Sequence, residues 1–413
     1  MAHKPFPDPP SWSERFLSVG ITGTNGKTST TSFLAAILDD FAPPVPRTTT
    51  LGLWLGAEQQ TDLPQTYLGF IRLLERARDR GARFASLEVT SEVLAQGFAQ
   101  KWPFRAAIFT NLSHDHLDAH QSPEHYFASK AQLFLHLPPG ATAVINGADE
   151  VSPLLAEVTP DHVKKLFYGV ASRGAPQLPL DVSVEDVSLS WQGTRARVVA
   201  LTEAARALEL PEQLELGAIG EIFLENALAA LVMATALGVP ADRAARVLAL
   251  QQAPRGRFEV VHESPHVIID YAHTPDALSR TLRTAKTLCA GELWVIFGAG
   301  GNRDKDKRPE MGKAAASADH VVLTTDNPRD ESPLAIAEAI AAGLKSVEGA
   351  PRPQIQLDRA LAIAQTLNQA GPHDTIVIAG KGHETGILRD GQLQGQGDHE
   401  LVARALPKTP PAV

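Results

Sequence analysis

The sequence predicts an α/β fold in two domains, each with a mostly parallel sheet covered by helices. First, short apolar runs rich in Val and Ile alternate with amphipathic helical stretches, which is the pattern of parallel sheets that are buried on both faces. Second, the segment "QQAPRGRFEV" carries Pro254 and Gly256 and restarts the strand pattern, which indicates a domain boundary near residue 252. The length of 413 residues is ample for two such cores.

In the first domain, residues 19–252, we expect strands in "FLSVGIT", "FASLEV", "RAAIFT" and "TAVIN". Helices are expected at Thr28–Leu38 and Tyr67–Arg80, and again in the Ala/Leu-rich stretch "ENALAALVMATALGV". Between about residues 160 and 215 the pattern changes to short alternating runs such as "DVSVEDVSLSW". This change predicts a hairpin insertion in the first domain.

The second domain, residues 253–413, repeats the alternation of strands and helices. Its expected strands are "HVIID", "LWVIFG", "HVVLTT" and "DTIVIAG", and Ser332–Leu344 is an expected helix. This order is typical of a Rossmann-like α/β domain. At the other end of the chain, residues 1–18 are rich in proline and polar side chains, which predicts a loose leader.

Composition excludes several classes of function. A net charge of −9 disfavours a nucleic-acid partner, because such a partner needs a basic surface. The single cysteine, Cys289, excludes an internal disulfide and a cysteine-rich metal site. No apolar run approaches the 18 or so residues of a membrane span, and no signal-peptide core is visible, so we expect no membrane partner and a cytoplasmic location.

The stretch "VGITGTNGKTSTTSFLAAIL" has the order of a strand, a glycine-rich turn and a helix start. In this order backbone N–H groups surround phosphates, Lys27 supplies a counter-charge and the Thr28 hydroxyl can bind Mg²⁺, which predicts a P-loop ATPase domain. The strict G-x-x-x-x-G-K-[ST] pattern fails because Ile21 occupies its first glycine position, so a chance Gly-Lys-Thr is the alternative. The candidate nucleotide-binding residues are Gly23, Thr24, Asn25, Gly26, Lys27, Thr28 and Ser29.

Polar side chains follow two further strands. Glu88 ends "FASLEV", and in open α/β sheets ligands lie beyond the carboxyl ends of strands. The loop "NLSHDHLDAH" follows the next strand and supplies Asn111, Asp115, His116, Asp118 and His120. These residues are candidates for a metal site, and a solvated polar loop is the alternative.

A lysine lies in an apolar stripe of the next expected helix. Ser122 as N-cap and Pro123 at the first helical position open this helix. At 100° per residue, Lys130 falls between Phe127 and Phe134 on one side and Tyr126 and Leu133 on the other. Such a lysine snorkels to water, is paired, or has been changed chemically.

Ten stretches in the same order as in the family resemble the Mur ligases, and the later ones look closest to MurE-type members, which add the third residue of the peptidoglycan stem peptide. The matching stretches are "TGTNGKT", "LEVTSEVL", "TNLSHDHLD", "HYFASKAQLF", "ENALAAL", "GRFEV", "DYAHTPDAL", "FGAGGNRDKDKRPEMG", "TTDNPRDESP" and "GKGHE".

The resemblance implies an ATP-dependent ligase that activates a carboxylate as an acyl phosphate and joins it to the amine of an amino acid. Lys27 would then hold the β- and γ-phosphates, and Thr28 with Glu88 would hold one Mg²⁺. His116 and Lys130 would serve a second Mg²⁺, with Lys130 expected as a carbamate formed with CO₂. Both chemical steps place negative charge on oxygens, so cations and fixed N–H dipoles should dominate catalysis. The implied catalytic residues are Lys27, Lys130, His116, Arg257 and His273.

The resemblance also assigns residues around the rest of ATP and the amino acid. Asn111 and Asn226 match positions near the nucleotide, and the second domain would add Arg257, Asp270, Tyr271 and His273. The form "DNPR" accompanies diaminopimelate in MurE-type enzymes, which makes Arg329 a candidate for gripping a distal carboxylate. The residues expected around the amino acid are Asp326, Asn327, Arg329, Gly380 and Glu384. The alternative for "DNPRDESP" is a turn that caps the helix at Ser332.

Three departures from the MurE type concern the acceptor. The phosphate loop begins near residue 20, which suggests that the usual N-terminal UDP-binding domain is lacking. The family's "TTPD" has no clean match in "AEQQTDLPQTYL", and its "SSH" reads Thr90-Ser91-Glu92. Its "GGDRD" reads "GGNRD", with Asn302 in place of an acid. The ATP and metal parts are therefore retained while the acceptor parts differ.

We therefore expect an amide ligase with ATP and two Mg²⁺ as cofactors and an acceptor other than UDP-MurNAc-dipeptide. Folylpolyglutamate synthases and cyanophycin synthetase ligase modules resemble such an architecture. One alternative is a true MurE-type reaction in which a partner protein supplies acceptor recognition. Two others are an NTP-driven switch or kinase without ligation, and a catalytically inactive partner subunit.

Overall fold

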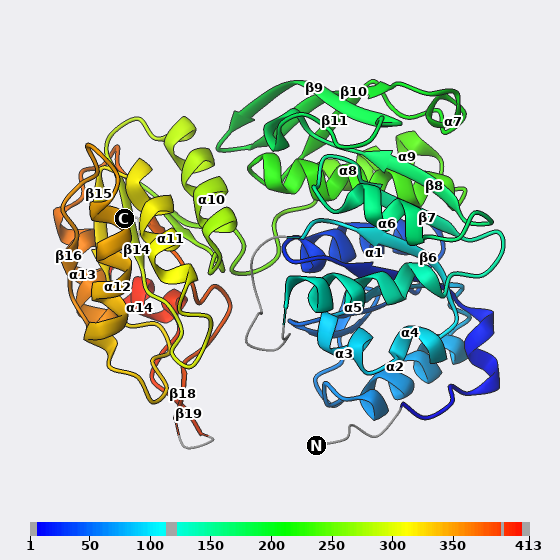
Figure 1. The fold of residues 1–413 in the computed structure, drawn as a ribbon, viewed down its shortest axis with the longest axis horizontal. Helices are drawn as coiled ribbons and strands as arrows, with labels where there is room; N and C mark the ends of the chain where they lie inside the picture. Colours follow the sequence, from blue (N-terminus) through cyan, green and yellow to red (C-terminus); the bar gives the residue numbers. More distant parts are fainter. Residues whose placement is uncertain (1–5, 113–121, 390–391, 407–413) are drawn as a thin grey trace, which may run out of the picture. The chain divides into compact units, whose positions relative to one another are not determined.

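The computed structural model describes residues 6–112, 122–389 and 392–406, and the chain divides into two compact units with the boundary after Gln252 (Figure 1). Both units are α/β, so the predicted fold class is confirmed. Each unit is built around its own sheet. Among the described residues, none of the helices combines the length and the apolar character that crossing a bilayer requires.

The first unit contains an 11-stranded sheet in the order β11-β10-β9-β8-β7-β6-β1-β5-β2-β3-β4. Its strands are β1 (Leu17–Thr22), β2 (Pro46–Thr49), β3 (Gly52–Leu55), β4 (Glu58–Gln59), β5 (Phe84–Glu88), β6 (Phe104–Phe109), β7 (Thr142–Asn146), β8 (Lys164–Tyr168), β9 (Val182–Ser190), β10 (Gly193–Ala200) and β11 (Gln213–Leu216). Pairing is parallel from β2 through β5, β1, β6, β7 and β8 to β9. The carboxyl ends of β1, β5, β6 and β7 therefore lie at one edge of the sheet.

The two margins of this sheet are antiparallel. On one side β2, β3 and β4 form a meander, and on the other β9, β10 and β11 continue the sheet. The alternating runs between residues 160 and 215 thus form β8 to β11 together with a short helix, α7 (Glu203–Arg206). Only β9 and β10 form a tight hairpin, and they extend the parallel sheet rather than a separate lobe.

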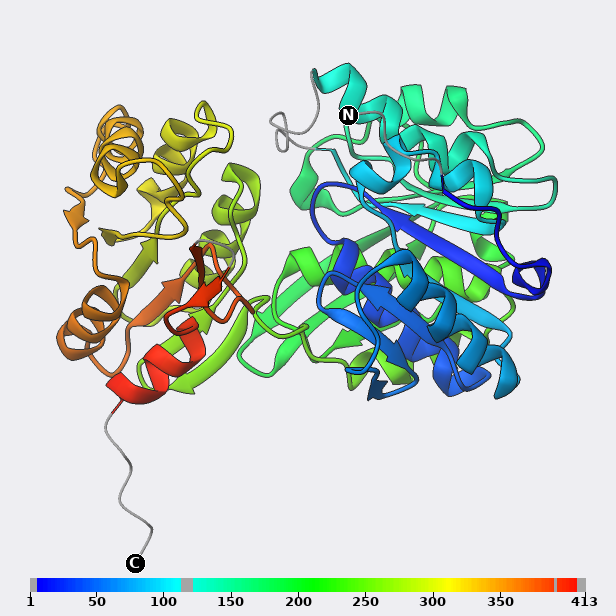
Figure 2. The same ribbon diagram turned by 90° about the horizontal axis from the view of Figure 1, so that it is seen from below.

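Helices cover both faces of the sheet (Figures 1 and 2). On one face α1 (Lys27–Phe41) packs against α8 (Glu221–Ala236) and α9 (Ala241–Ala249). The other face carries α2 (Tyr67–Asp79), α3 (Ser91–Ala95), α4 (Phe98–Lys101), α5 (Pro123–Leu135) and α6 (Ser152–Val158). Apolar residues of these helices and of β5, β6 and β7 form one buried core, which fixes the sheet edge in place.

The segment before β1 differs from the expected loose leader over its described part. Residues 6–16 include a short 3₁₀ helix, η1 (Ser11–Arg15), and their aromatic side chains contact the first unit. Phe6 packs on Phe98 with ring centroids 5.1 Å apart, and Arg78 lies over the Trp12 ring. Burial of these large aromatic surfaces outweighs the proline-rich composition from which looseness was predicted.

The second unit has a six-stranded sheet in the order β12-β13-β17-β14-β15-β16. All its neighbours pair in parallel except β12, which pairs antiparallel with β13. The strands are β12 (Glu259–Glu263), β13 (His266–Ile269), β14 (Leu293–Phe297), β15 (His320–Leu323), β16 (Gln354–Ile355) and β17 (Thr375–Ile378), with a separate ribbon of β18 (Ile387–Arg389) and β19 (Gln392–Gln394). The helices are α10 (Pro275–Leu288), α11 (Lys307–Ala314), α12 (Pro333–Lys345), α13 (Arg359–Gln369) and α14 (Asp398–Ala405), with two further 3₁₀ turns in the chain, η2 (Ala171–Arg173) and η3 (Ala315–Ser317).

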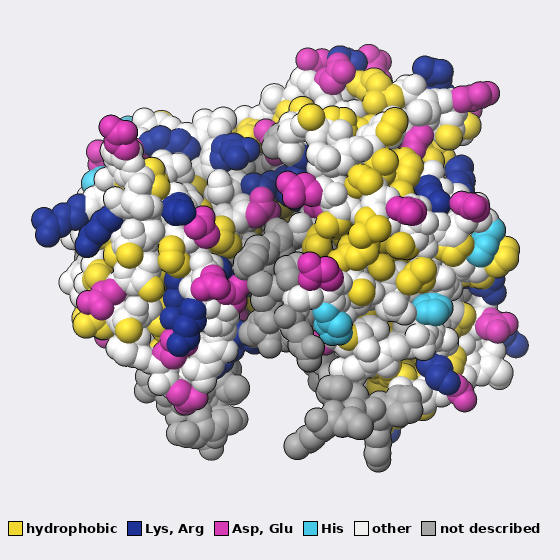
Figure 3. Space-filling model, viewed as in Figure 1, with side chains coloured by type: hydrophobic (Ala, Val, Ile, Leu, Met, Phe, Trp, Pro, Cys, Tyr) yellow, Lys and Arg dark blue, Asp and Glu magenta, His cyan; other side chains and the backbone are white. Residues whose placement is uncertain are grey.

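Charged side chains of both signs are interspersed on the face drawn in Figure 3. This arrangement fits the net charge of −9.

A buried ion pair joins α13 to the start of α14. Arg359 Nε donates to Asp398 Oδ1 at 2.7 Å and its Nη2 donates to Oδ2 at 2.8 Å, while Asp398 is fully buried. Burial is the largest single influence on the pKa of Arg359 and acts to lower it. The charge of Asp398 acts in the opposite direction, and the net result is a raised pKa. The pair therefore holds two charges away from water and depends on both partners.

We predict that Asp398→Asn lowers the free energy of unfolding by about 3 kcal/mol, because it leaves a buried guanidinium without its counter-ion. Urea unfolding followed by the combined fluorescence of the five tryptophans, which lie in both units, measures the effect. Asp62→Asn, which breaks an exposed pair with Arg76, is the control and should cost less than about 1 kcal/mol. Equal losses in the two variants would contradict this account.

Candidate functional site

The phosphate loop follows β1 and leads directly into α1, as the sequence predicts. Gly23 and Gly26 have φ values of 151° and 85°, which a residue with a side chain rarely adopts. The loop is held from the side, because Asn25 N–H donates to Asn111 Oδ1 at 2.9 Å and Asn111 Nδ2 donates back to the Asn25 carbonyl at 3.0 Å. Thr110 Oγ1 also donates to the Asn25 carbonyl, at 2.7 Å. The end of β6 thus fixes the loop that follows β1.

The first turn of α1 carries the charged and hydroxyl groups predicted to hold phosphate and metal. Lys27 Nζ donates to the carbonyls of Gly23 and Thr24 at 3.1 and 2.8 Å, so its ammonium curls over the loop. Thr28 and Ser29 are buried in the same turn. An N-terminal turn of a helix with a lysine above it is an anion-binding arrangement.

Thr28 and Glu88, the two predicted ligands of the first Mg²⁺, lie together. Thr28 Oγ1 donates to Glu88 Oε2 at 2.9 Å, and the Thr50 backbone N–H donates to the same oxygen at 3.1 Å. A hydroxyl and a carboxylate beside a phosphate loop are the oxygen donors that Mg²⁺ prefers. The donor set therefore fits the ion, and the contact joins the start of α1 to the end of β5.

Lys130 projects from α5 toward the phosphate loop and is only 1% exposed. Its Nζ donates to the Gly23 carbonyl at 2.7 Å and lies 4.3 Å from the centre of the Tyr126 ring. The alternative that this lysine snorkels to water therefore does not describe the structure. The lysine instead reaches the site through the apolar stripe in which the helical phase placed it.

Other predicted residues of this site fall in two groups. His116 and its neighbours Asp115, Asp118 and His120 lie outside the described residues. Asn226 is buried on α8, and a Cβ added to Gly26 would clash with its Oδ1, so the side chain adjoins the phosphate loop. Within the described part of the chain its Nδ2 has no hydrogen-bond partner, which leaves a donor for a ligand.

A buried polar network behind the loop was not predicted. Asn146 Nδ2 donates to Glu225 Oε1 at 2.8 Å and to the Thr110 carbonyl at 2.7 Å, and Arg173 pairs with Glu225. Thr110 in turn holds Asn25. The position of Thr110 at a strand end, just before Asn111, was the one local signal of this network in the sequence. The Arg173–Glu225 pair joins positions 52 residues apart, so no local pattern indicates it.

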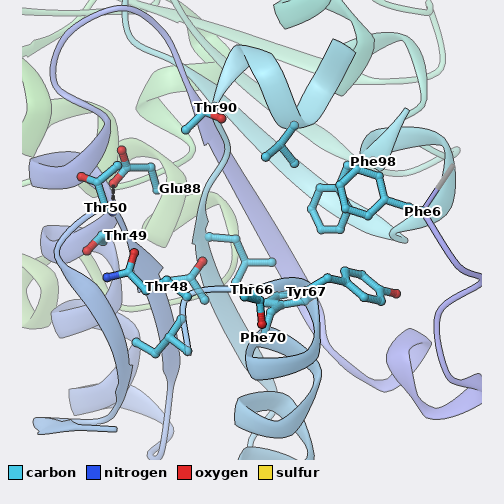
Figure 4. A pocket seen from close by; sticks show the side chains of 14 residues that line it. Phe6, Thr48, Thr49, Thr50, Thr66, Tyr67, Phe70, Glu88, Thr90 and Phe98 are labelled. Carbon is cyan, nitrogen blue, oxygen red and sulfur yellow. Dashed lines mark hydrogen bonds between the residues drawn. The ribbon is translucent and has the colours of Figure 1, made fainter. Parts of the chain in front are cut away.

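A cavity of about 410 Å³ adjoins Glu88 (Figure 4). Thr48, Thr49 and Thr50 line it near the glutamate, and Thr90 lines it beside the start of α3. The rest of the lining is aromatic and aliphatic, with Gln65 and Thr66 as further polar members: Phe6, Leu53, Tyr67, Phe70, Leu87, Val93 and Phe98. The sequence analysis assigned a role to Glu88 alone among these residues, although it placed Thr90 and the stretch with Gln65, Thr66 and Tyr67 among the acceptor parts that differ from the family.

In the second unit, one group of predicted residues surrounds the turns after β13 and β17. Arg257 lies over the Tyr271 ring at 3.9 Å, and His273 Nδ1 donates to the Tyr271 carbonyl at 2.9 Å. Asp270 is buried, and burial raises its pKa against the hydrogen bonds from the backbone N–H of Phe258 and Ala272. The buried Asp270 carboxylate therefore holds the backbone on both sides of this group in place.

His383, in the "GKGHE" turn beside this group, was not predicted as a site residue. Its ring lies 5.2 Å from that of Tyr271. Burial, assisted by the nearby arginines, lowers its pKa to about 4, so the imidazole is neutral at pH 7.

The residues predicted around the amino acid gather at the carboxyl ends of β14, β15 and β17. A Cβ on Gly380 would lie 2.5 Å from Asp326 Oδ2. Burial raises the pKa of Glu384, and the charge of Asp326 raises it further. Arg329 donates to the Gly301 carbonyl, and the Gly301 N–H donates to the Asn327 carbonyl. Among the described residues the buried Asn327 Oδ1 has no hydrogen-bond partner.

Comparisons with known proteins agree with this arrangement. Family models match for "Mur ligase middle domain" over residues 21–234 and for "Mur ligase, glutamate ligase domain" over residues 256–382. A relative from Aquifex aeolicus (strain VF5), a UDP-N-acetylmuramoyl-L-alanyl-D-glutamate–2,6-diaminopimelate ligase, is 38% identical over 387 residues, which is 93% of this chain and 75% of the relative. A ligase of the same name from Thermosynechococcus vestitus is 36% identical over 90% of this chain and 73% of its own length.

Solved structures show the same relationship. A UDP-N-acetylmuramoyl-L-alanyl-D-glutamate–2,6-diaminopimelate ligase aligns with a TM-score of 0.64 and 32% identity, over 94% of this chain and 78% of its own. Folylpolyglutamate synthase from Mycobacterium tuberculosis aligns with a TM-score of 0.68 at 20% identity, over 89% of each chain, and shares the fold.

A phosphate loop in one unit, followed by a second α/β unit that matches the glutamate ligase domain, identifies an ATP-dependent ligase that forms an amide bond. The chain belongs to the Mur ligase family. Members of this family use ATP and Mg²⁺ and act on small molecules.

The site makes one prediction about pH. Asp149, behind the phosphate loop, is 6% exposed and accepts a hydrogen bond from Leu112 N–H at 2.9 Å. Burial raises the pKa of Asp149 to about 6. Because the folded protein binds this proton more tightly than the unfolded chain, the stability contribution is lost as pH rises from about 4 to 6.

Between pH 4 and pH 7 the wild type loses the stability that the bound proton of Asp149 contributes, whereas Asp149→Asn has no such proton to lose. We therefore expect the free energy of unfolding of the variant minus that of the wild type to rise by about 2–3 kcal/mol over this range. Urea titrations at several pH values measure the difference. The exposed neighbour Glu150 provides the control, Glu150→Gln, and we expect the larger change with pH in Asp149→Asn. A flat difference for Asp149→Asn would contradict a raised pKa.

Proposed function

We propose that the protein activates a carboxylate acceptor other than UDP-MurNAc-dipeptide and joins it to an amino acid that carries a distal carboxylate. The observation that carries the proposal is the cavity that opens directly at Glu88. A carboxylate placed at that end would lie next to the loop that holds the γ-phosphate. The reaction consumes ATP, and we place it in the cytoplasm, where ATP is abundant.

The proposed ligation reaction has two steps. An acceptor carboxylate oxygen attacks the γ-phosphorus, the bond to ADP breaks, and an acyl phosphate forms. The amine nitrogen then attacks the acyl carbon, inorganic phosphate leaves, and the amine loses a proton. Mg²⁺ at Thr28 and Glu88 would neutralise phosphate charge, while Lys27 and the loop N–H groups bind the oxygens on which charge develops.

The residues of "DNPR" support an amino acid with an anionic side chain. Arg329 lies in the turn after β15, and its guanidinium reaches the Gly301 carbonyl. Asn327 offers an acceptor with no partner among the described residues, which suits an ammonium or amide donor. Asp326 and Glu384 add negative charge nearby, which favours the amino group of the incoming amino acid.

A screen of amino acids against carboxylate acceptors, with ADP release and product mass as readouts, tests this function. We expect ADP release that needs both substrates, with diaminopimelate or another diacid among the best amines. Arg329→Ala should raise the KM for a diacid at least tenfold and leave the KM for alanine unchanged. Turnover with UDP-MurNAc-dipeptide as the preferred acceptor would sink the acceptor proposal, and ATP hydrolysis without an amine would favour an NTP-driven switch.

Lys130 carries a second part of the proposal, a carbamate formed with CO₂. A lysine ammonium that is 1% exposed beside a phosphate loop is costly as a cation, whereas an anionic oxygen there would bind a hard metal. We expect a ¹³C signal from labelled bicarbonate in wild type and none in Lys130→Ala. Ligase activity should fall at least about 100-fold in the variant and recover partly with added formate. Full activity in Lys130→Ala would rule the role out.

A further inference from the structure

The cavity beside Glu88 has two chemically different ends (Figure 4). At one end lie Glu88 and the threonines of residues 48–50, which continue from the metal-binding edge. At the other end the rings of Phe6, Tyr67 and Phe98 face the space, with Phe70 beside them. A ligand that spans the cavity would therefore need a polar head and an apolar body.

The aromatic end is a built wall. Phe6 packs against Tyr67 and Phe98 with centroid distances of 5.5 and 5.1 Å. Behind it, Phe70 packs edge-on against Trp102 at 4.7 Å. Because these rings come from three separate segments, the wall exists only in the folded unit and keeps its shape by mutual packing.

The segment that carries Phe6 is tied down by polar contacts. Tyr67 Oη donates to the Pro7 carbonyl at 3.4 Å, and Lys101 Nζ lies 2.5 Å from Asp8 Oδ1. The surface ion pair adds little free energy, so the ring contacts hold the segment and the polar contacts fix its direction. Residues before β1 thus contribute a wall to a cavity of the first unit.

Charge narrows the class of ligand. None of the described lining residues is a lysine, arginine or histidine, and Glu88 is the one acid among them. A second carboxylate or a phosphate on the ligand body would meet no cationic side chain in this lining and would lie against apolar rings, which is unfavourable. The ligand body that fits this lining is uncharged and apolar.

We propose that this cavity binds the apolar body of the acceptor, an aryl or alkyl monocarboxylic acid whose carboxylate points to Glu88. This inference rests on the proposed function and specifies its acceptor class. The size of about 410 Å³ suits a body of one ring or a medium-length alkyl chain together with its carboxylate. Phe6, Tyr67 and Phe98 would then determine which acceptors are accepted.

Binding of 3-phenylpropanoate, measured by ligand-observed NMR with the full chain and Mg²⁺-ADP present, tests the inference without requiring turnover. Val93 lines the cavity from α3 and is half-buried, so Val93→Trp should fill the space and weaken binding at least tenfold. Leu68→Trp is the matched control, because Leu68 is 56% exposed on α2 and is not part of the lining. Its affinity should stay within twofold of wild type.

Phe6→Ala is a second test variant. It removes a side chain, so its result does not depend on how the introduced tryptophan of Val93→Trp packs. It removes a half-buried ring, and we expect binding of 3-phenylpropanoate to weaken several-fold while ADP affinity stays near wild type. Glutarate, with a second carboxylate, should bind at least tenfold more weakly than 3-phenylpropanoate. Unchanged binding in Val93→Trp and Phe6→Ala, no binding of the monoacid, or tighter binding of glutarate would each overturn the inference.

The ADP-release assay separates the two levels of the argument. If 3-phenylpropanoate binds and Val93→Trp abolishes that binding, the cavity assignment stands whether or not the compound is turned over. If no carboxylate supports ADP release with any amino acid, the proposed function fails. If ADP release occurs only with polyanionic acceptors and is insensitive to Val93→Trp, the function stands and the apolar acceptor is wrong.

Discussion

Parallel pairing of β1, β5, β6 and β7 is the constraint on which the first site depends. It brings four carboxyl strand ends to one edge, and each end supplies a different part. The phosphate loop follows β1, Glu88 ends β5, Thr110 and Asn111 follow β6, and Asn146 ends β7. Hydrogen bonds then join the segments that follow these strands, from Thr28 Oγ1 to Glu88 and from Asn111 Nδ2 to the Asn25 carbonyl, so the loop is preorganised before any ligand binds.

Burial of polar groups around this edge has a thermodynamic cost that only specific partners or ligands offset. Glu225 is satisfied by Arg173 and Asn146, and this network holds Thr110 against the phosphate loop. Asn226 and Asn327 keep an unpartnered polar atom within the described residues, which is the pattern of a ligand-binding group rather than a structural one. In the second unit Arg359 and Asp398 offset each other's buried charge.

Periodicity and strand-end chemistry were sufficient to predict most of the architecture. Strands such as Thr142–Asn146 and the phase of Lys130 on α5 follow from local pattern, whereas the pairing of Thr28 with Glu88 was expected only from the resemblance to the Mur ligases. Long-range packing could not be predicted. Phe6 was assigned to a loose segment because no local signal shows that it meets Tyr67 and Phe98. The aromatic cavity was missed for the same reason, since its rings come from segments far apart in the sequence.

A crystal structure with Mg²⁺ and a non-hydrolysable ATP analogue would show where the metal ion and the γ-phosphate bind. We predict a magnesium ion bonded to Thr28 Oγ1 and a Glu88 carboxylate oxygen at about 2.1 Å, with the γ-phosphate under Lys27 and facing the cavity. A metal ion bound elsewhere, or a nucleotide whose γ-phosphate points away from Glu88, would contradict it.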